Sequence, residues 1–121
     1  MKEDFEFFNN LLKDLVGQRL SSITFILDYW QLGFDDFGFS VMTTIKVDGV
    51  GEIVRDGDRD FRNRLCECIT HNVVQAQAAN DVVYIAFDNG YKIELSFRKE
   101  DYVGPEALHF FHPRLPSIMV V

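Results

Sequence analysis

The hydrophobic pattern of this chain occurs twice, and this repetition is what most restricts the ways in which the chain can fold. When the sequence is aligned with itself so that Phe8 meets Phe61, Leu12 meets Leu65. In both segments the apolar residues recur every three or four positions, which is the spacing of an amphipathic helix. The repetition therefore predicts two similar halves, each of which begins with a helix.

Strands are predicted to follow each helix. In the same alignment Trp30 meets Val83 and Leu32 meets Ile85, within segments where apolar and polar residues alternate as they do in half-buried strands. The segments predicted as strands are 20–27, 30–34, 39–47, 73–79, 82–87 and 91–97. Because neither half can bury its apolar face alone, we expect an α+β fold in which an antiparallel sheet packs with two helices about a pseudo-two-fold axis.

Capping and turn residues predict where these elements begin and end. Asp4 is a suitable cap for the first helix, and Gly17 is a suitable left-handed residue to end it. The second helix is expected to span Asp60 to His71. Residues 88–90, Asp-Asn-Gly, are the strongest hairpin signal, because Asn-Gly tolerates the positive φ angles of a type I′ turn.

The size of the chain fits one domain. It has 121 residues, of which 47% are hydrophobic, and this is enough to build a core without disulfides or metals. We expect a single domain, 1–121, made of approximate halves 3–50 and 56–100 and a C-terminal extension at 101–121.

The net charge restricts the classes of partner. The 19 acidic side chains outnumber the 12 basic ones, which gives a net charge of −7. An acidic surface repels the phosphate backbone, so we expect no nucleic-acid partner. The apolar runs are far shorter than the ~20 residues that span a bilayer, so we expect no membrane association. The charge is compatible with a basic protein partner, and equally with a role in solubility alone.

The two cysteines provide information about the cellular compartment of the protein and about metal binding. Cys66 and Cys68 are too close in sequence for an unstrained disulfide. Free thiols, in a chain that starts without a signal-peptide pattern, predict a cytoplasmic protein. On a helix Cys66 would point away from Cys68 and His71, so the three could not converge on a tetrahedral metal. We therefore expect no metal site and no cofactor.

Three segments, 20–34, 86–97 and 100–107, contain short sequence motifs. The first contains Asp-Tyr-Trp-Gln-Leu-Gly-Phe, the second contains Phe-Asp-Asn-Gly, and the third contains Tyr-Val-Gly-Pro-Glu-Ala. Together they resemble a family of small uncharacterised bacterial proteins that has a Phe-x-x-Asp-Tyr-x-Gln-Leu-x-Phe-Asp block and a C-terminal Tyr-x-Gly-Pro-Glu-Ala block. The chain departs from the family at Asp36-Phe37, where the family has Gly-Pro. The resemblance implies a bacterial protein but no activity.

Asp28 is the best candidate for a buried acid or base, because Tyr29 and Trp30 beside it could supply an apolar wall. Both aromatic residues are also of the amphipathic kind that is enriched at binding hot spots. The alternative is structural: Asp28 would then be an ordinary turn residue, and the aromatic side chains would belong to the core.

The second candidate segment precedes the C-terminus. Tyr102 and Glu106 flank Gly-Pro, and they could meet a ligand or a partner at a presented edge. His109 could act as a general base or share a ligand face with His112. The structural alternatives are a rigid turn in which Glu106 bonds nearby backbone donors, and histidines at the surface. The candidate binding residues are therefore Asp28, Tyr29, Trp30, Tyr102, Glu106 and His109, and no catalytic residue is assigned.

These observations favour a non-enzymatic protein-interaction module, and the analogy with small acidic α+β bacterial proteins points to an immunity-like role. The alternative is a small enzyme or ligand-binding domain with its site between the two halves, using Asp28, Glu106 and His109. An enzyme is less favoured because the sequence has no nucleophile elbow and no Gly-rich phosphate loop. A third hypothesis is a homo-oligomeric module, which an apolar patch at 118–121 would support.

Overall fold

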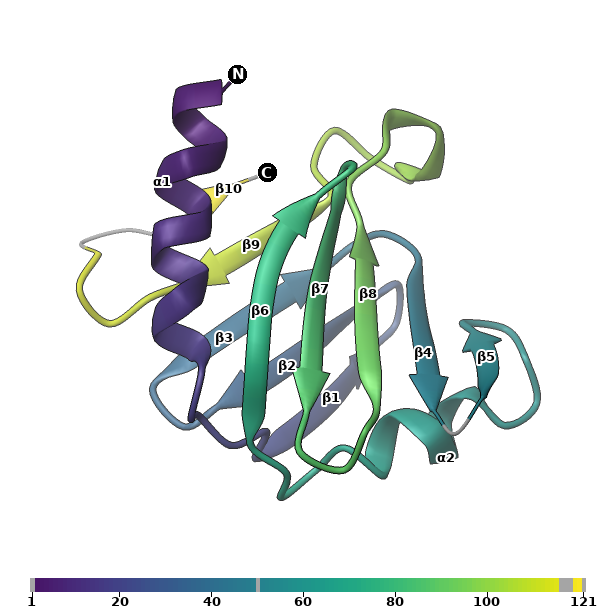
Figure 1. Cartoon of the computed structure of the whole chain (residues 1–121). Helices are drawn as coiled ribbons and strands as arrows, with labels where there is room; N and C mark the ends of the chain where they lie inside the picture. Colours follow the sequence, from purple (N-terminus) through teal and green to yellow (C-terminus); the bar gives the residue numbers. More distant parts are fainter. Residues whose placement is uncertain (1, 50, 116–118, 121) are drawn as a thin grey trace.

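Two five-stranded antiparallel sheets pack face to face in this computed structural model, which describes residues 2–49, 51–115 and 119–120 (Figure 1). The first sheet contains, in hydrogen-bonded order, β1 (Ser22–Ile26), β2 (Tyr29–Phe34), β3 (Phe37–Val41), β9 (Leu108–Phe111) and β10 (Met119–Val120). The second contains β5 (Glu52–Arg55), β4 (Ile45–Gly49), β8 (Lys92–Ser96), β7 (Val82–Phe87) and β6 (Val73–Ala79). The helices are α1 (Lys2–Leu12) and α2 (Phe61–Cys66), with short 3-10 helices η1 (Lys13–Leu15) and η2 (Lys99–Asp101).

The α+β class is confirmed, with antiparallel sheets and two α-helices. The order of a helix followed by a three-strand meander occurs twice, first as α1-β1-β2-β3 and then as α2-β6-β7-β8. The pseudo-two-fold axis itself stays a prediction. None of the described helices is long and apolar enough to cross a membrane.

The chain passes from one sheet to the other after each meander. Residues 42–44 lead from β3 into β4, which pairs with β8 of the second sheet. The segment 97–107 leads from β8 back to β9, which pairs with β3 of the first sheet. Each sheet therefore combines the meander of one half with a hairpin that follows the other meander.

The single strand predicted at 39–47 is wrong, because this segment contains β3 and β4 in different sheets. Val41 and Ile45 are both fully buried and lie four positions apart, an even spacing. The alternation of apolar and polar residues therefore continues across the crossing, and hydrophobic periodicity alone could not reveal it.

The second helix is also shorter than predicted, because α2 ends at Cys66 and not at His71. Thr70 has a φ of +79° and donates its backbone N–H to the carbonyl of Leu20. Leu20 in turn donates to the carbonyl of His71, so this stretch pairs with the chain ahead of β1 and cannot continue the helix. Asp4 does not cap the first helix, since it lies inside α1.

The type I′ turn occurs at another hairpin than the one predicted. Asn80 and Asp81, between β6 and β7, have φ angles of +54° and +60°, as both central residues of a type I′ turn require. At 88–90 only Gly90 has a positive φ, and its N–H bonds to the carbonyl of Phe87. That hairpin therefore uses a tight turn with a left-handed glycine at its end.

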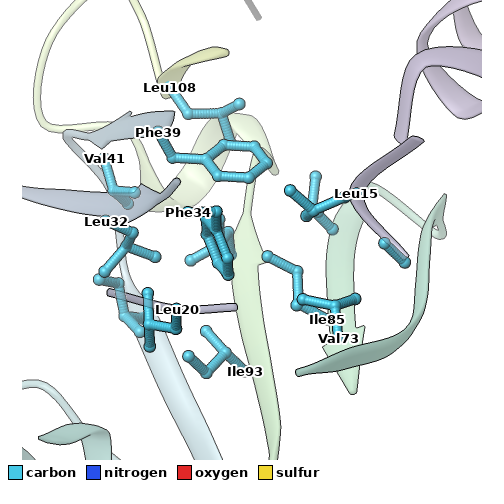
Figure 2. Packing of buried hydrophobic residues seen from close by; sticks show 14 of the residues in the cluster. Leu15, Leu20, Leu32, Phe34, Phe39, Val41, Val73, Ile85, Ile93 and Leu108 are labelled. Atoms are coloured by element: carbon cyan, nitrogen blue, oxygen red, sulfur yellow. The ribbon is translucent and has the colours of Figure 1, made fainter. Parts of the chain in front are cut away.

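The core lies between the two sheets, and Phe34 is at its centre (Figure 2). The ring of Phe34 stacks on that of Phe87 with centroids 6.3 Å apart and planes 10° apart. These two residues occupy equivalent positions in the self-alignment and belong to different sheets. Burying a side chain of this size contributes roughly 1.5–3 kcal/mol. The alternating residues of the last predicted strand, Tyr91, Ile93, Leu95 and Phe97, are buried as expected.

Helix α1 lies beside the free edge of β6 (Figure 1). The side-chain amide of Asn9 donates to the carbonyl of Ala78 at 3.1 Å, and its oxygen accepts from the N–H of the same residue at 2.7 Å. One side chain thus satisfies both backbone groups of an edge-strand residue. This closes part of an edge that could otherwise pair with another chain.

The C-terminal segment is joined to η1 through a polar contact. His112 is buried, and its Nε2 lies 2.8 Å from a carboxylate oxygen of Asp14. Its Nδ1 accepts the backbone N–H of Arg114, and the Arg114 side chain pairs with Asp14. At the end of the chain, Met119–Val120 form β10, whereas Ile118 and Val121 of the apolar patch predicted at 118–121 lie outside the described residues.

We predict that Asn9→Ala lowers the free energy of unfolding by about 1–2 kcal/mol, because it removes two hydrogen bonds at the edge of β6. Urea denaturation measures this loss. Asn10→Ala is the matched control, since Asn10 is the next residue of the same helix and is exposed. Because alanine has the higher helix propensity, Asn10→Ala should not destabilise the protein, and equal losses for both variants would contradict the role of the edge contact.

Asp14→Asn is expected to destabilise the protein at neutral pH and to have little effect in acid. Hydrogen bonding to His112 and the nearby Arg114 side chain hold the pKa of Asp14 below its usual 3.8. Ionised Asp14 therefore stabilises the fold above the pKa of the unfolded chain, and this contribution disappears as the pH falls through the lowered value. We expect a difference of about 0.5–1 kcal/mol, since the carboxylate is partly exposed to solvent.

The measurement is urea unfolding of both proteins from about pH 7 down to about pH 3. Asp36→Asn is the control, because Asp36 is exposed in the β2–β3 turn. A difference between the wild type and Asp14→Asn that persists unchanged to the lowest pH would contradict the role of the charge.

Candidate functional site

A hollow opens where the chain crosses between the two sheets. Its main part has a volume of about 470 Å³, and an adjoining part of about 370 Å³ shares some of the same walls. The lining comes from residues 25–30 of the β1–β2 hairpin, 41–44 between β3 and β4, 103–106 ahead of β9, and the side chains Asp56 and Arg62. We call this region the crossover hollow.

One wall is the tight turn between β1 and β2. Ile26 pairs with Tyr29, so only Leu27 and Asp28 form the loop. Leu27 is completely exposed, with 102% of its reference surface in contact with solvent. Asp28 is also exposed, and Tyr29 is half-buried below it. The turn thus presents an aliphatic and an acidic side chain at the edge of the hollow.

A second part of the lining is the loop at 103–106, and two hydrogen bonds hold its base. The Ser96 hydroxyl lies 2.5 Å from a carboxylate oxygen of Asp101. The buried Thr43 hydroxyl donates to the backbone carbonyl of Asp101 at 3.2 Å. Val103, two residues later, is 86% exposed. The loop therefore has a fixed origin and carries an exposed apolar side chain.

Trp30 lies at the base of the hollow and is almost completely buried. Its ring contacts Phe25 edge-on at a centroid distance of 3.8 Å and Phe61 at 5.3 Å. Its Nε1–H donates to a carboxylate oxygen of Asp56 at 3.2 Å. The indole is held by two aromatic rings and by a hydrogen bond at its polar end, so it forms a rigid part of the lining.

Carboxylates predominate among the charged groups of the lining. Asp28, Asp56 and Glu106 line the crossover hollow, and Arg62 is its guanidinium. The guanidinium carbon of Arg62 lies 4.7 Å from the centroid of the Phe25 ring, in a cation–π contact. The positive group is therefore directed onto an aromatic face, and the hollow carries an excess of negative charge.

The structure brings together four of the six residues predicted as a binding site. Asp28, Tyr29 and Trp30 line the main part of the crossover hollow, and Glu106 lines the adjoining part together with Asp28 and Tyr29. Tyr102 instead packs against the core, and His109 lies on β9 outside the lining.

Glu106 and His109 form a contact behind the hollow. The Nε2 of His109 is buried and lies 3.3 Å from a carboxylate oxygen of Glu106, but the angles do not meet those of a hydrogen bond. The contact is therefore electrostatic at most. It places the Glu106 carboxylate next to an imidazole and not among the backbone donors of a rigid turn, the structural alternative for this residue.

Sequence reasoning missed Leu27, Val103, Asp56 and Arg62. Leu27 is the last residue of the strand predicted at 20–27, but β1 ends at Ile26 and Leu27 lies in the turn. A large apolar residue directly before Asp28 in a hairpin turn was the available signal. For Asp56 and Arg62 no signal existed, because only the tertiary fold brings them to Trp30 and Phe25.

The two cysteines differ in their surroundings. Both are free, Cys66 is exposed and Cys68 is buried. Burial raises the pKa of the Cys68 thiol to about 12, so this residue is not a reactive thiolate at neutral pH. Across residues 2–49, 51–115 and 119–120, no three His, Cys, Asp or Glu side chains are grouped as metal ligands would be.

Thr43→Val is expected to loosen the loop at 103–106, because it removes the bond to the carbonyl of Asp101 without changing the shape of the side chain. Leaving a partly buried carbonyl unpaired costs about 1 kcal/mol. Amide hydrogen exchange at Val103 and Gly104 should accelerate severalfold. Thr44→Val is the control, since Thr44 is half-buried and adjacent. Unchanged exchange in Thr43→Val would show that the Ser96 contact alone holds the loop.

No protein-family model, curated protein or solved structure matches this chain. The resemblance to a family of small bacterial proteins therefore stays a prediction, and the function has to be inferred from the geometry of the crossover hollow.

Proposed function

We propose that this chain is a non-enzymatic interaction module that binds a partner protein at the crossover hollow, as an immunity protein binds its toxin. The observation that carries the proposal is the exposure of Leu27 and Val103, two apolar side chains that line the same concavity. Large apolar side chains gathered around a hollow mark interaction sites on soluble proteins. The free thiols of Cys66 and Cys68 support a cytoplasmic setting for this interaction.

The hollow also has the composition of a binding hot spot. Tyr29 and Trp30 form its aromatic base, and aromatic residues of this kind dominate the energetics of protein interfaces. Trp30 is held by Phe25 and Asp56, so little side-chain freedom is lost when a partner covers it. The rigid base and the exposed apolar walls together favour a protein partner.

The alternative is a small enzyme or ligand-binding domain, and the presence of Asp28 and Glu106 in one hollow favours it. An acyl- or phosphoryl-transfer enzyme needs a nucleophile with an adjacent base. The described lining contains no serine, cysteine, histidine or lysine. Its hydroxyls belong to Tyr29, Thr43 and Thr44; that of Thr43 is bonded to Asp101, and no hydrogen bond joins the other two to a carboxylate of the described lining. A non-enzymatic role therefore accounts for more of the site.

Site-specific photocrosslinking tests this proposal. A benzoyl-phenylalanine residue placed at position 27 or 103 should crosslink to the same discrete protein in lysate of the native cell. The matched control is position 74, because Val74 is also an exposed apolar residue but lies on β6, outside the crossover hollow. An excess of unlabelled wild type should suppress the crosslink, whereas unlabelled Leu27→Asp should suppress it much less.

The absence of a crosslinked protein at positions 27 and 103 would reject the proposal. The same products at all three positions would also reject it, because they would show that the protein adheres through any exposed apolar residue.

A further inference from the structure

We propose that the partner inserts a basic side chain, flanked by apolar residues, into the crossover hollow between Asp28 and Glu106. This inference rests on the proposed function and adds the chemistry of the occupant. It follows from the combination of two exposed apolar walls with an excess of carboxylates in the same lining.

The carboxylates of the hollow are available to a partner. Asp28 is exposed in the β1–β2 turn and forms no side-chain hydrogen bond or ion pair within the described part of the chain. Asp56 uses one carboxylate oxygen for the Trp30 indole. Glu106 lies near His109 without the geometry of a hydrogen bond. A basic side chain of a partner would therefore find carboxylate oxygens whose hydrogen-bonding capacity is not fully used within the protein.

The positive group of the lining does not neutralise these carboxylates. Arg62 lies over the Phe25 ring, and its guanidinium carbon is 4.7 Å from the ring centroid. No ion pair joins Arg62 to an acidic residue among the described residues. The hollow thus remains complementary to positive charge, and the net charge of −7 would accelerate the approach of a basic partner.

The apolar walls favour binding of a protein side chain over binding of a simple cation. Lys and Arg carry an aliphatic stem that packs against apolar surface while the charged group reaches a carboxylate. Leu27 and Val103 would contact the stem and its apolar neighbours, and Tyr29 offers an aromatic face below them. A guanidinium also fits a carboxylate with two parallel hydrogen bonds, so arginine is the expected occupant.

Trp30 provides a direct signal for occupation of the hollow. It is the single tryptophan of the chain and lies at the base of the lining. Its fluorescence therefore reports binding of any peptide that lacks tryptophan. The probes are acetyl-Leu-Arg-Leu-Arg-Leu-amide and the same peptide with Gln or with Glu in place of Arg, titrated into the full chain up to about 1 mM.

The Arg peptide should produce a saturable change in Trp30 fluorescence, the Gln peptide should bind roughly tenfold more weakly, and the Glu peptide should not bind. Added salt should weaken only the Arg peptide. Asp28→Asn and Glu106→Gln should each weaken the Arg peptide roughly two- to fivefold and leave the Gln peptide unchanged. Asp36→Asn, at the other end of β2, is the control and should change neither.

Equal binding of the Arg and Gln peptides, or no loss in either hollow variant, would overturn the inference. So would the absence of any fluorescence change with all three peptides. The crosslinking experiment separates this failure from that of the proposed function. A partner that crosslinks at positions 27 and 103 while the peptides show no preference for Arg would leave the interaction proposal standing and reject the basic occupant.

Discussion

The burial of aromatic side chains between the two sheets is the interaction on which the rest of this structure depends. Phe34 and Phe87 come from equivalent strands of the two halves and stack at the centre of the core. Neither meander could remove its ring from water without the other. The two sheets therefore depend on each other for a core, and in this fold the chain passes from one to the other twice. Those two passages determine where the surface of the molecule is hollow.

The two crossing segments are bonded to each other and are not independent loops. The N–H of Met42 donates to the carbonyl of Ala107 at 2.8 Å, and the Thr43 hydroxyl donates to that of Asp101. The first crossing thus holds both ends of the segment that carries Val103. Because the β1–β2 turn lies against the same crossing, the walls of the crossover hollow are positioned by the core through the backbone.

The sequence predicted what depends on local pattern and missed what depends on the path of the chain. The strands 73–79 and 82–87 were predicted with their observed bounds, because alternation and turn residues mark them clearly. The crossing within 39–47 was missed, since Val41 and Ile45 keep the same alternation in different sheets. Asp28 was found because a turn and two aromatic residues adjoin it. Asp56 could not be found, because only the tertiary fold brings it to Trp30.

Exposure of Leu27 has an energetic consequence that bears on the proposed interaction. Burial of a leucine side chain stabilises a fold by roughly 1.5–3 kcal/mol. The exposed Leu27 does not contribute this stabilisation, although a polar residue could form the same turn. Trp30, a few residues away, is buried and fixed by three contacts, so the fold here is not short of packing. Under the proposed function, the apolar surface at the rim is the area that a partner would cover, and the same free energy would be recovered on binding. Because the base of the hollow is already rigid, most of that gain would appear as affinity.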